Sequence, residues 1–137
     1  MSKNICPKRL GELAEVCLLL HAMTLGFSVS RPYGDSDPFD FIFYWPPTGR
    51  LTRIQVKSTR FPGPHHFIVD LRRRYKGAHQ YSASNVDFIL AYAVPRDAWY
   101  VIPIGEVTGA RNFRLCPDFP GIRSWTAAYR DAWDLLK

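Results

Sequence analysis

The sequence lacks several features that would indicate whole classes of protein. It has only three cysteines, at scattered positions, which argues against a disulfide framework and fits a reducing compartment. None of its uninterrupted apolar runs approaches the roughly 18 residues that a membrane span needs. Glu12 and Glu15 interrupt the N-terminal segment that could otherwise resemble a secretory signal. We therefore expect an intracellular, cytoplasmic protein with no membrane partner.

The composition favours one folded domain with a polyanionic partner. At 137 residues the chain is long enough for one core, and nine Phe, seven Tyr and four Trp supply the bulk to fill it. We expect a single domain over residues 1–137. Lys and Arg outnumber Asp and Glu by 18 to 12, which gives a net charge of +6. A charge of this sign favours nucleic acid as a partner, although it fixes no fold.

The local patterns predict a mixed sheet between two helices. Residues 8–25 predict a helix that stops at Gly26. Its second half, residues 16–25, is apolar almost all round and should be covered on more than one side. Alternation predicts strands from Phe27, on both sides of residues 46–49, and at residues 67–71 and 99–104, with a central strand at 86–94. Ser124 precedes apolar residues at helical spacing, which predicts an amphipathic C-terminal helix. The expected fold class is α/β (α+β).

The segment "DPFDFIFYWPPTGRLTRIQVKS" predicts a β-hairpin that gathers polar groups on one face. If residues 46–49 form the loop, Trp45 pairs with Arg50 and Asp40 lies opposite Gln55. Lys57 points to the same side, about 7 Å further along the strand. The opposite face is then apolar and faces the core, with Phe39, Phe41, Phe43, Ile54 and Val56.

Two interpretations of this polar face stay open. It is either an ordinary solvated edge, where Asp40 and Lys57 form a surface ion pair of small worth, or a chemical site. The first helix favours the site, because Glu15 lies in the most apolar element and a carboxylate there needs a counter-charge. Two carboxylates, an amide oxygen and a lysine suit one hard cation, Mg²⁺ or Mn²⁺.

These residues match a known family. "GELAE" in the first helix, the Asp of "DPFDFIF" and the "QVK" of "IQVKS" resemble the PD-(D/E)XK nuclease superfamily. The chain looks most like its group I intron-associated, homing-endonuclease branch, in which Gln replaces the acid before XK. The motifs cover about residues 9–60. The resemblance implies a restriction-endonuclease-like core and Mg²⁺-dependent (or Mn²⁺-dependent) hydrolysis of DNA phosphodiester bonds.

The resemblance also implies roles for individual residues. Asp40 would be the central metal ligand, with Gln55 and the backbone carbonyl of Val56 as further ligands. Glu15 would be a ligand or a carboxylate that orients water. Lys57 would orient the attacking water and stabilise charge on the phosphate.

Basic residues near this face are candidates for DNA binding. Arg53 lies on the site face and Arg60 follows it, so both could contact phosphates. The segment 71–81 mixes positive charge with Tyr75 and Tyr81, a combination suited to backbone contacts and base stacking. Its candidate phosphate ligands are Arg72, Arg73, Arg74 and Lys76, although a merely solubilising loop has the same composition.

Three functions remain open from the sequence. The first is a metal-dependent endodeoxyribonuclease acting on linear duplex DNA, and the second is the same enzyme acting on branched DNA, as in junction-resolving relatives. The third is a catalytically inactive nucleic-acid-binding module of the same fold, because Gln55 removes one negative charge from the site. A domain of this size reaches one half-site, so cutting both strands predicts a homodimer or homotetramer.

Overall fold

The computed structural model of the 137-residue chain describes residues 5–60, 63, 65–72, 80–119 and 124–137. Helix α1 (Pro7–Leu25) starts with proline in its first turn and ends at Gly26, whose φ of 98° lies in the left-handed region. The N–H of Gly26 bonds the carbonyls of Ala22 and Met23 there. The predicted first helix is therefore confirmed, and glycine suits the position because it carries no Cβ.

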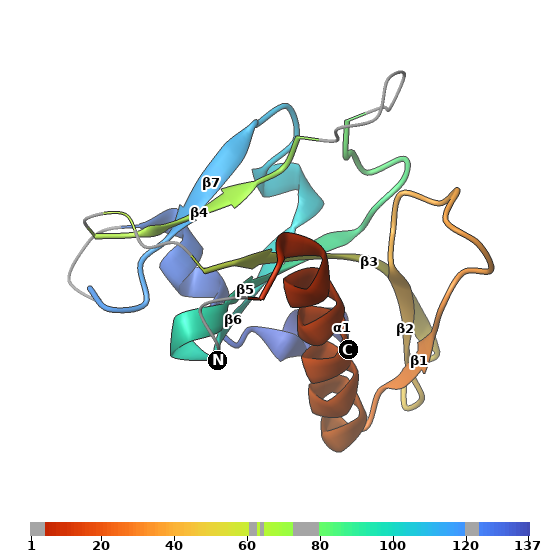
Figure 1. Cartoon of the computed structure of the whole chain (residues 1–137). Helices are drawn as coiled ribbons and strands as arrows, with labels where there is room; N and C mark the ends of the chain where they lie inside the picture. The colour runs from red at the N-terminus through yellow and green to blue at the C-terminus, as the bar shows by residue number, and fades with distance from the viewer. Residues whose placement is uncertain (1–4, 61–62, 64, 73–79, 120–123) are drawn as a thin grey trace.

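Five strands form a mixed sheet in the order β1-β2-β3-β5-β6 (Figure 1). Neighbours pair antiparallel except β3 and β5, which run parallel. A second sheet pairs β4 with β7 in antiparallel fashion. The strands are β1 (Ser28–Ser30), β2 (Phe41–Trp45), β3 (Arg50–Thr59), β4 (Phe67–Asp70), β5 (Phe88–Ala93), β6 (Ala98–Pro103) and β7 (Asn112–Leu115). The sequence predicted all of them except β7.

Apolar residues cover both faces of the five-stranded sheet. Helix α1 packs on one face, where Leu18 and Ala22 meet Phe43 and Ile54. The β4–β7 pair lies on the other side (Figure 1), and its inward residues share a second apolar cluster with β5 and β6. Every residue of β5 is buried, so the prediction of a central strand covered on both sides is confirmed.

The β2–β3 hairpin has the register that the sequence predicted. Trp45 pairs with Arg50 across the turn, and the ladder continues to Phe41 opposite Ile54. Phe41 and Phe43 point into the cluster under α1, as expected. Phe39 does not: it packs against the cluster on the opposite side of the sheet. The period-2 alternation fails there because β2 begins only at Phe41.

The predicted amphipathic C-terminal helix is wrong. The segment forms two short 3₁₀ turns, Trp125–Tyr129 and Trp133–Leu136, and Ser124 makes no capping hydrogen bond. Arg130 forms a β-bridge with Tyr100, and the N–H of Asp131 bonds the carbonyl of Trp99. Pairing with β6 thus interrupts the helix, and Asp131 takes a positive φ of 51° at the break.

One side of α1 is more open than its composition predicted. Val16, Leu20 and Met23 are all more than half exposed, so the helix is covered on one side only.

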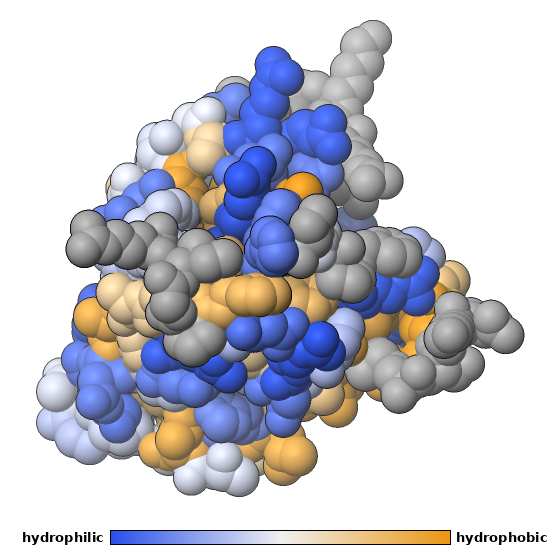
Figure 2. Space-filling model, turned by 90° about the vertical axis from the view of Figure 1, so that its left-hand side faces the viewer, coloured by the Kyte–Doolittle hydropathy of each residue, from blue (hydrophilic) through white to orange (hydrophobic). Residues whose placement is uncertain are grey.

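Figure 2 shows another side of the molecule, where hydrophilic residues predominate around a band of hydrophobic ones. No helix in the described part of the chain has the length and apolar character needed to cross a membrane.

Candidate active site

A pocket of about 550 Å³ opens beside β3, at the end of the hairpin away from its turn. Its walls come from β3, from the segment between β1 and β2, and from the crossover between β3 and β5. The polar side chains that line it are Arg31, Asp35, Asp37, Asp40, Gln55, Lys57, Asp70, Arg72 and Tyr81. Three of the four predicted catalytic residues therefore share one pocket, and Glu15 is the one not lining it.

Asp40 lies just before β2 begins, at a level where β3 is paired with β5 but no longer with β2. Its backbone N–H bonds the carbonyl of Ile54 at 2.8 Å. Its carboxylate accepts a hydrogen bond from the backbone N–H of Val56, also at 2.8 Å. Nearer the turn of the hairpin, such N–H groups of β3 bond backbone carbonyls of β2; at Val56 the side chain of Asp40 takes their place. This bond fixes the Asp40 carboxylate against β3, at the level of the QVK segment.

Gln55, Val56 and Lys57 present their groups in the alternation that the sequence predicted. Gln55 and Lys57 line the pocket, whereas the side chain of Val56 is buried in the core under α1. The amide nitrogen of Gln55 donates to the carbonyl of Val56 at 3.3 Å. The amide group of Gln55 therefore lies at the carbonyl of Val56, the residue whose N–H bonds the Asp40 carboxylate.

Glu15 approaches the site from α1 through an arginine. The guanidinium of Arg31 lies 3.2 Å from the Glu15 carboxylate, whose side chain is only 23% exposed. The same guanidinium stacks over the ring of Phe41, 5.7 Å from its centroid. Arg31 follows β1 directly and also lines the pocket, so it links α1 to the Asp40 end of the site.

Both carboxylates are held in an environment that disfavours their charge. Burial raises the pKa of Glu15 above its usual value, and the charge of Asp40 raises it further, while Arg31 opposes both effects. Burial also raises the pKa of Asp40, although the Val56 N–H and the charges of Lys57 and Arg31 act in the other direction. The pKa values of both carboxyl groups remain raised after the neighbouring positive charges are included, so an added cation would stabilise their charged forms.

This donor set fits a hard divalent cation. Two carboxylates with raised pKa, one amide oxygen and one backbone carbonyl are the oxygen ligands that Mg²⁺ and Mn²⁺ prefer. No group of three or more His, Cys, Asp or Glu side chains gathers as a metal cluster within the described residues. A site here would therefore need Gln55 and the Val56 carbonyl besides the acids Glu15 and Asp40.

The basic residues predicted to bind DNA are mostly engaged within the chain. The Arg53 side chain makes four hydrogen bonds, to Asp87 and to the carbonyls of Ala83 and Ser84. Arg72 forms a two-pronged ion pair with Asp70, and Arg60 donates to the carbonyl of Ile5. The other candidates, Arg73, Arg74 and Lys76, lie outside the described residues. Contacts between these six basic residues and DNA stay predictions.

Sequence reasoning missed Arg31 and expected Tyr81 to be an exposed stacking residue. Tyr81 is 8% exposed and belongs to the cluster between the sheets. Its ring lies under the ammonium group of Lys57, 5.1 Å from Nζ to the centroid. The register of β1 on β2 could have located Arg31, because Ser30 pairs with Ile42 and Arg31 therefore continues toward Asp40.

Comparisons with known proteins agree with this arrangement. A family model described as PD-(D/E)XK endonuclease matches residues 5–136. The solved structure of a bacterial homing endonuclease, I-Ssp6803I, resembles this one with a TM-score of 0.78. The two are 27% identical, over 95% of this chain and 90% of that chain. No curated protein matches the chain. The mixed α/β fold is restriction-endonuclease-like, and the chain belongs to the PD-(D/E)XK endonuclease family.

Proposed function

We propose that the chain is a Mg²⁺-dependent endodeoxyribonuclease of the homing type, which hydrolyses DNA phosphodiester bonds at the pocket beside β3. The observation that carries the proposal is the bond from the Val56 N–H to the Asp40 carboxylate. It joins the predicted acid to the QVK strand, so that Asp40, Gln55 and Lys57 face one space. Mn²⁺ has the same ligand preference and is the expected substitute.

Four groups would hold the ion: the carboxylates of Asp40 and Glu15, the amide oxygen of Gln55 and the carbonyl of Val56. A bound divalent cation supplies a water of lowered pKa and positive charge against the phosphate. Three of the four groups lie on or beside β3, a rigid strand paired on both sides at its centre. The Val56 carbonyl belongs to the paired strand and the Asp40 carboxylate is held by the Val56 N–H, so these two groups need little reorganisation when the ion enters.

The protein's own side chains have two further tasks. Lys57 lines the pocket and carries a positive charge that acts on Asp40, so its ammonium can donate hydrogen bonds to a phosphate oxygen. Charge on that oxygen grows as water attacks, and a fixed cation nearby stabilises it most at that point. Glu15, with its raised pKa, can accept a hydrogen bond from the attacking water.

The proposal is tested by cleavage of three substrates: supercoiled plasmid, a four-way junction and a pool of randomised duplex DNA. Each is incubated with the protein in Mg²⁺, Mn²⁺ or EDTA. We expect cutting that requires the metal and is lost in Asp40→Ala and in Lys57→Ala. Matched controls are Asp134→Asn, which removes a 92% exposed carboxylate, and Lys8→Ala on the exposed side of α1; both should cut normally.

Other outcomes identify the alternatives. Preference for the four-way junction would make the protein a junction-resolving enzyme with the same site. Binding to DNA without cutting in any metal or pool, unchanged in both variants, would leave an inactive nucleic-acid-binding module.

Double-strand cutting also requires two sites in one assembly. We therefore propose a homodimer or homotetramer with two-fold symmetry, because such symmetry places identical sites on the two strands. Light scattering after size-exclusion chromatography would report a monomer if this part of the proposal is wrong.

A further inference from the structure

We infer that Tyr81 is a positioning residue for Lys57, and that Arg53 and Asp87 anchor the chain segment that carries Tyr81. The inference rests on the proposed function, since it concerns how the proposed catalytic lysine is held. It gives Arg53 a role other than the phosphate contact that its place on the site face predicted.

The contact between Lys57 and Tyr81 is the first observation. The Lys57 Nζ lies 5.1 Å from the centroid of the Tyr81 ring, within the range of a cation–π interaction. Both residues line the pocket, and the ring is 8% exposed, so apolar neighbours fix its plane. A fixed ring restricts a long side chain that has four rotatable bonds and would otherwise sample many rotamers.

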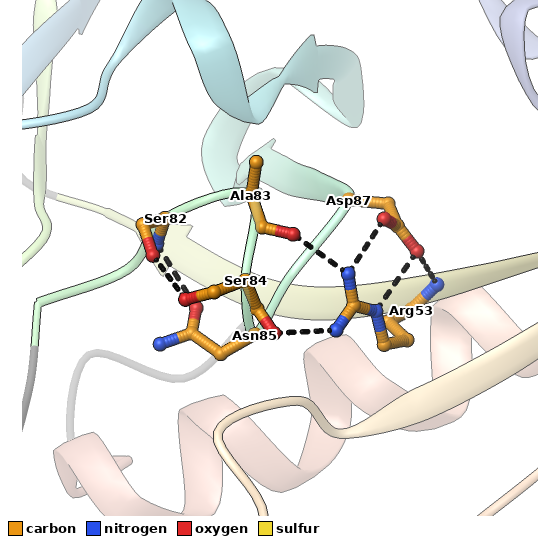
Figure 3. Close-up of polar contacts among 6 residues, drawn as sticks. All are labelled: Arg53, Ser82, Ala83, Ser84, Asn85 and Asp87. Carbon is orange, nitrogen blue, oxygen red and sulfur yellow. Dashed lines mark hydrogen bonds and ion pairs between the residues drawn. The ribbon is translucent and has the colours of Figure 1, made fainter.

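The segment after Tyr81 is folded by its own hydrogen bonds (Figure 3). The side-chain oxygen of Asn85 accepts from the N–H of Ser82 at 2.9 Å. The side-chain nitrogen of Asn85 donates to the carbonyl of Gln80 at 3.1 Å. The N–H groups of Asn85 and Val86 both bond the carbonyl of Ser82 at 3.0 Å. Asn85 thus ties together the residues on both sides of Tyr81, and the segment forms a compact turn.

Arg53 fastens this turn to β3. Its Nη1 and Nη2 donate to the carbonyls of Ser84 and Ala83, each at 2.9 Å, while Nε and Nη2 also bond the Asp87 carboxylate (Figure 3). The backbone N–H of Arg53 donates to the same carboxylate at 2.6 Å, and the N–H of Asp87 returns a bond to the Arg53 carbonyl. Four of the five guanidinium N–H groups are thereby used within the chain.

The spacing on β3 explains how the bonds of Arg53 to the turn affect the position of Lys57. Arg53 and Lys57 lie four residues apart on the same strand face, roughly 13 Å. The turn contacts both positions: Arg53 bonds the carbonyls of Ala83 and Ser84, and the Tyr81 ring meets Lys57. The same face of one rigid strand therefore supplies the lysine and fixes the ring that restricts it.

The first test needs no nuclease activity. Lysine side chains are reductively methylated with ¹³C, which keeps their charge, and the Lys57 signal is identified by its loss in Lys57→Arg. An aromatic face shifts groups above it to high field, so we expect this signal there, together with that of Lys137, whose Nζ lies 4.9 Å from the centroid of the Trp45 ring. The Lys57 signal should remain at high field in Tyr81→Phe, which keeps the ring, and lose this shift in Tyr81→Leu, while the Lys137 signal stays in place in both variants.

The second test measures cleavage in the same variants. Tyr81→Leu should lower kcat on the order of tenfold, the size of a partly desolvated cation–π contact. The Kd for DNA in EDTA should stay within about twofold, and Tyr81→Phe should restore kcat. A role in folding alone would instead lower the melting temperature and leave kcat per folded molecule unchanged.

The other outcomes separate the Lys57–Tyr81 contact from its importance for cleavage. An unmoved Lys57 signal in Tyr81→Leu overturns the contact, and a moved signal with unchanged kcat overturns its importance. Should Tyr81→Leu not fold, Asp87→Asn loosens the turn from outside the core and should move the Lys57 signal part of the way; an unmoved signal there also counts against the anchor. If the wild-type protein cuts no DNA, the proposed function fails, whereas the NMR result still decides whether Tyr81 holds Lys57.

Discussion

Removing the carboxylate of Asp87 should destabilise the protein by about 2 kcal/mol. Asp87 accepts three hydrogen bonds from Arg53, from the backbone N–H at 2.6 Å, from Nε at 3.2 Å and from Nη2 at 3.0 Å. Asp87→Ala deletes all three and leaves the guanidinium with the carbonyls of Ala83 and Ser84. The β3 N–H then loses its partner at a half-buried position.

The magnitude follows from exposure. Hydrogen bonds to charged groups contribute about 1.5–3 kcal/mol when buried, whereas fully exposed ion pairs contribute about 0–1 kcal/mol. The side chains of Arg53 and Asp87 are 32% and 34% exposed, which places their network between these limits. For a chain of this size, about 2 kcal/mol corresponds to a fall in melting temperature of about 6–8 °C.

The loss should also depend on pH. Burial would raise the pKa of Asp87, but the hydrogen bonds from the side chain and backbone of Arg53 outweigh it and hold the pKa below its usual value of 3.8. A carboxylate with a lowered folded-state pKa stabilises the protein above its unfolded-state pKa and loses this effect as pH falls through the folded-state value. The gap between wild type and Asp87→Ala should be constant near neutral pH and shrink below about pH 4.

Urea unfolding of a double-mutant cycle measures this prediction. The cycle combines Asp87→Ala with Arg53→Met, which keeps the length of the aliphatic part of the side chain and removes the guanidinium. We expect a coupling free energy of at least about 1 kcal/mol between the two changes. Additivity within about 0.3 kcal/mol would refute the network as a stabilising unit, and a gap that persists unchanged at pH 3 would refute the role of the Asp87 charge.

The two predicted ligand carboxylates, Asp40 and Glu15, give two further predictions. Burial raises the pKa of Asp40, so its charged form opposes folding near neutral pH. Asp40→Asn should therefore raise stability at pH 8 without metal by about 0.5–2 kcal/mol, measured by thermal unfolding. A lower or equal melting temperature would contradict the sign. If the proposed site binds Mg²⁺, the ion should stabilise the wild type and not Asp40→Asn. Arg31→Gln should tighten the binding of Mn²⁺ about threefold to tenfold, measured by calorimetry without DNA. The reason is that the Arg31 guanidinium lies 3.2 Å from the Glu15 carboxylate and competes with the ion for its charge. An unchanged affinity would show that Arg31 does not compete with the ion.

The hairpin could be predicted from sequence because its register depends on local information. The four residues 46–49 fix the turn, and alternation in β3 separates buried Ile54 and Val56 from Gln55 and Lys57. The ladder then extends toward Asp40, and only the bond from the Val56 N–H to its carboxylate had no sequence signal. Local patterning thus places three of the four predicted catalytic residues in one pocket.

Contacts between distant segments could not be predicted in the same way. Tyr81 reaches Lys57 through the crossover between β3 and β5, and Arg53 finds Asp87 across 34 residues. The C-terminal residues show helical spacing, but pairing of Arg130 with Tyr100 overrides it. β7 alternates from Asn112 to Leu115, a signal that was present in the sequence, although it is too short to distinguish from a loop without its partner β4.

The site exists because β2 and β3 differ in length. β3 has ten residues and β2 has five, so β3 continues past the start of β2 and exposes the N–H of Val56 on that side. Burying this edge with another strand would satisfy the N–H but would close the pocket. Asp40 satisfies it with a carboxylate instead, and the same carboxylate is then held beside Gln55 and Lys57. A single hydrogen bond thus satisfies one backbone N–H and fixes the carboxylate that we propose as a metal ligand; an amide at this position could satisfy the N–H but would lack the charge that the proposed chemistry needs.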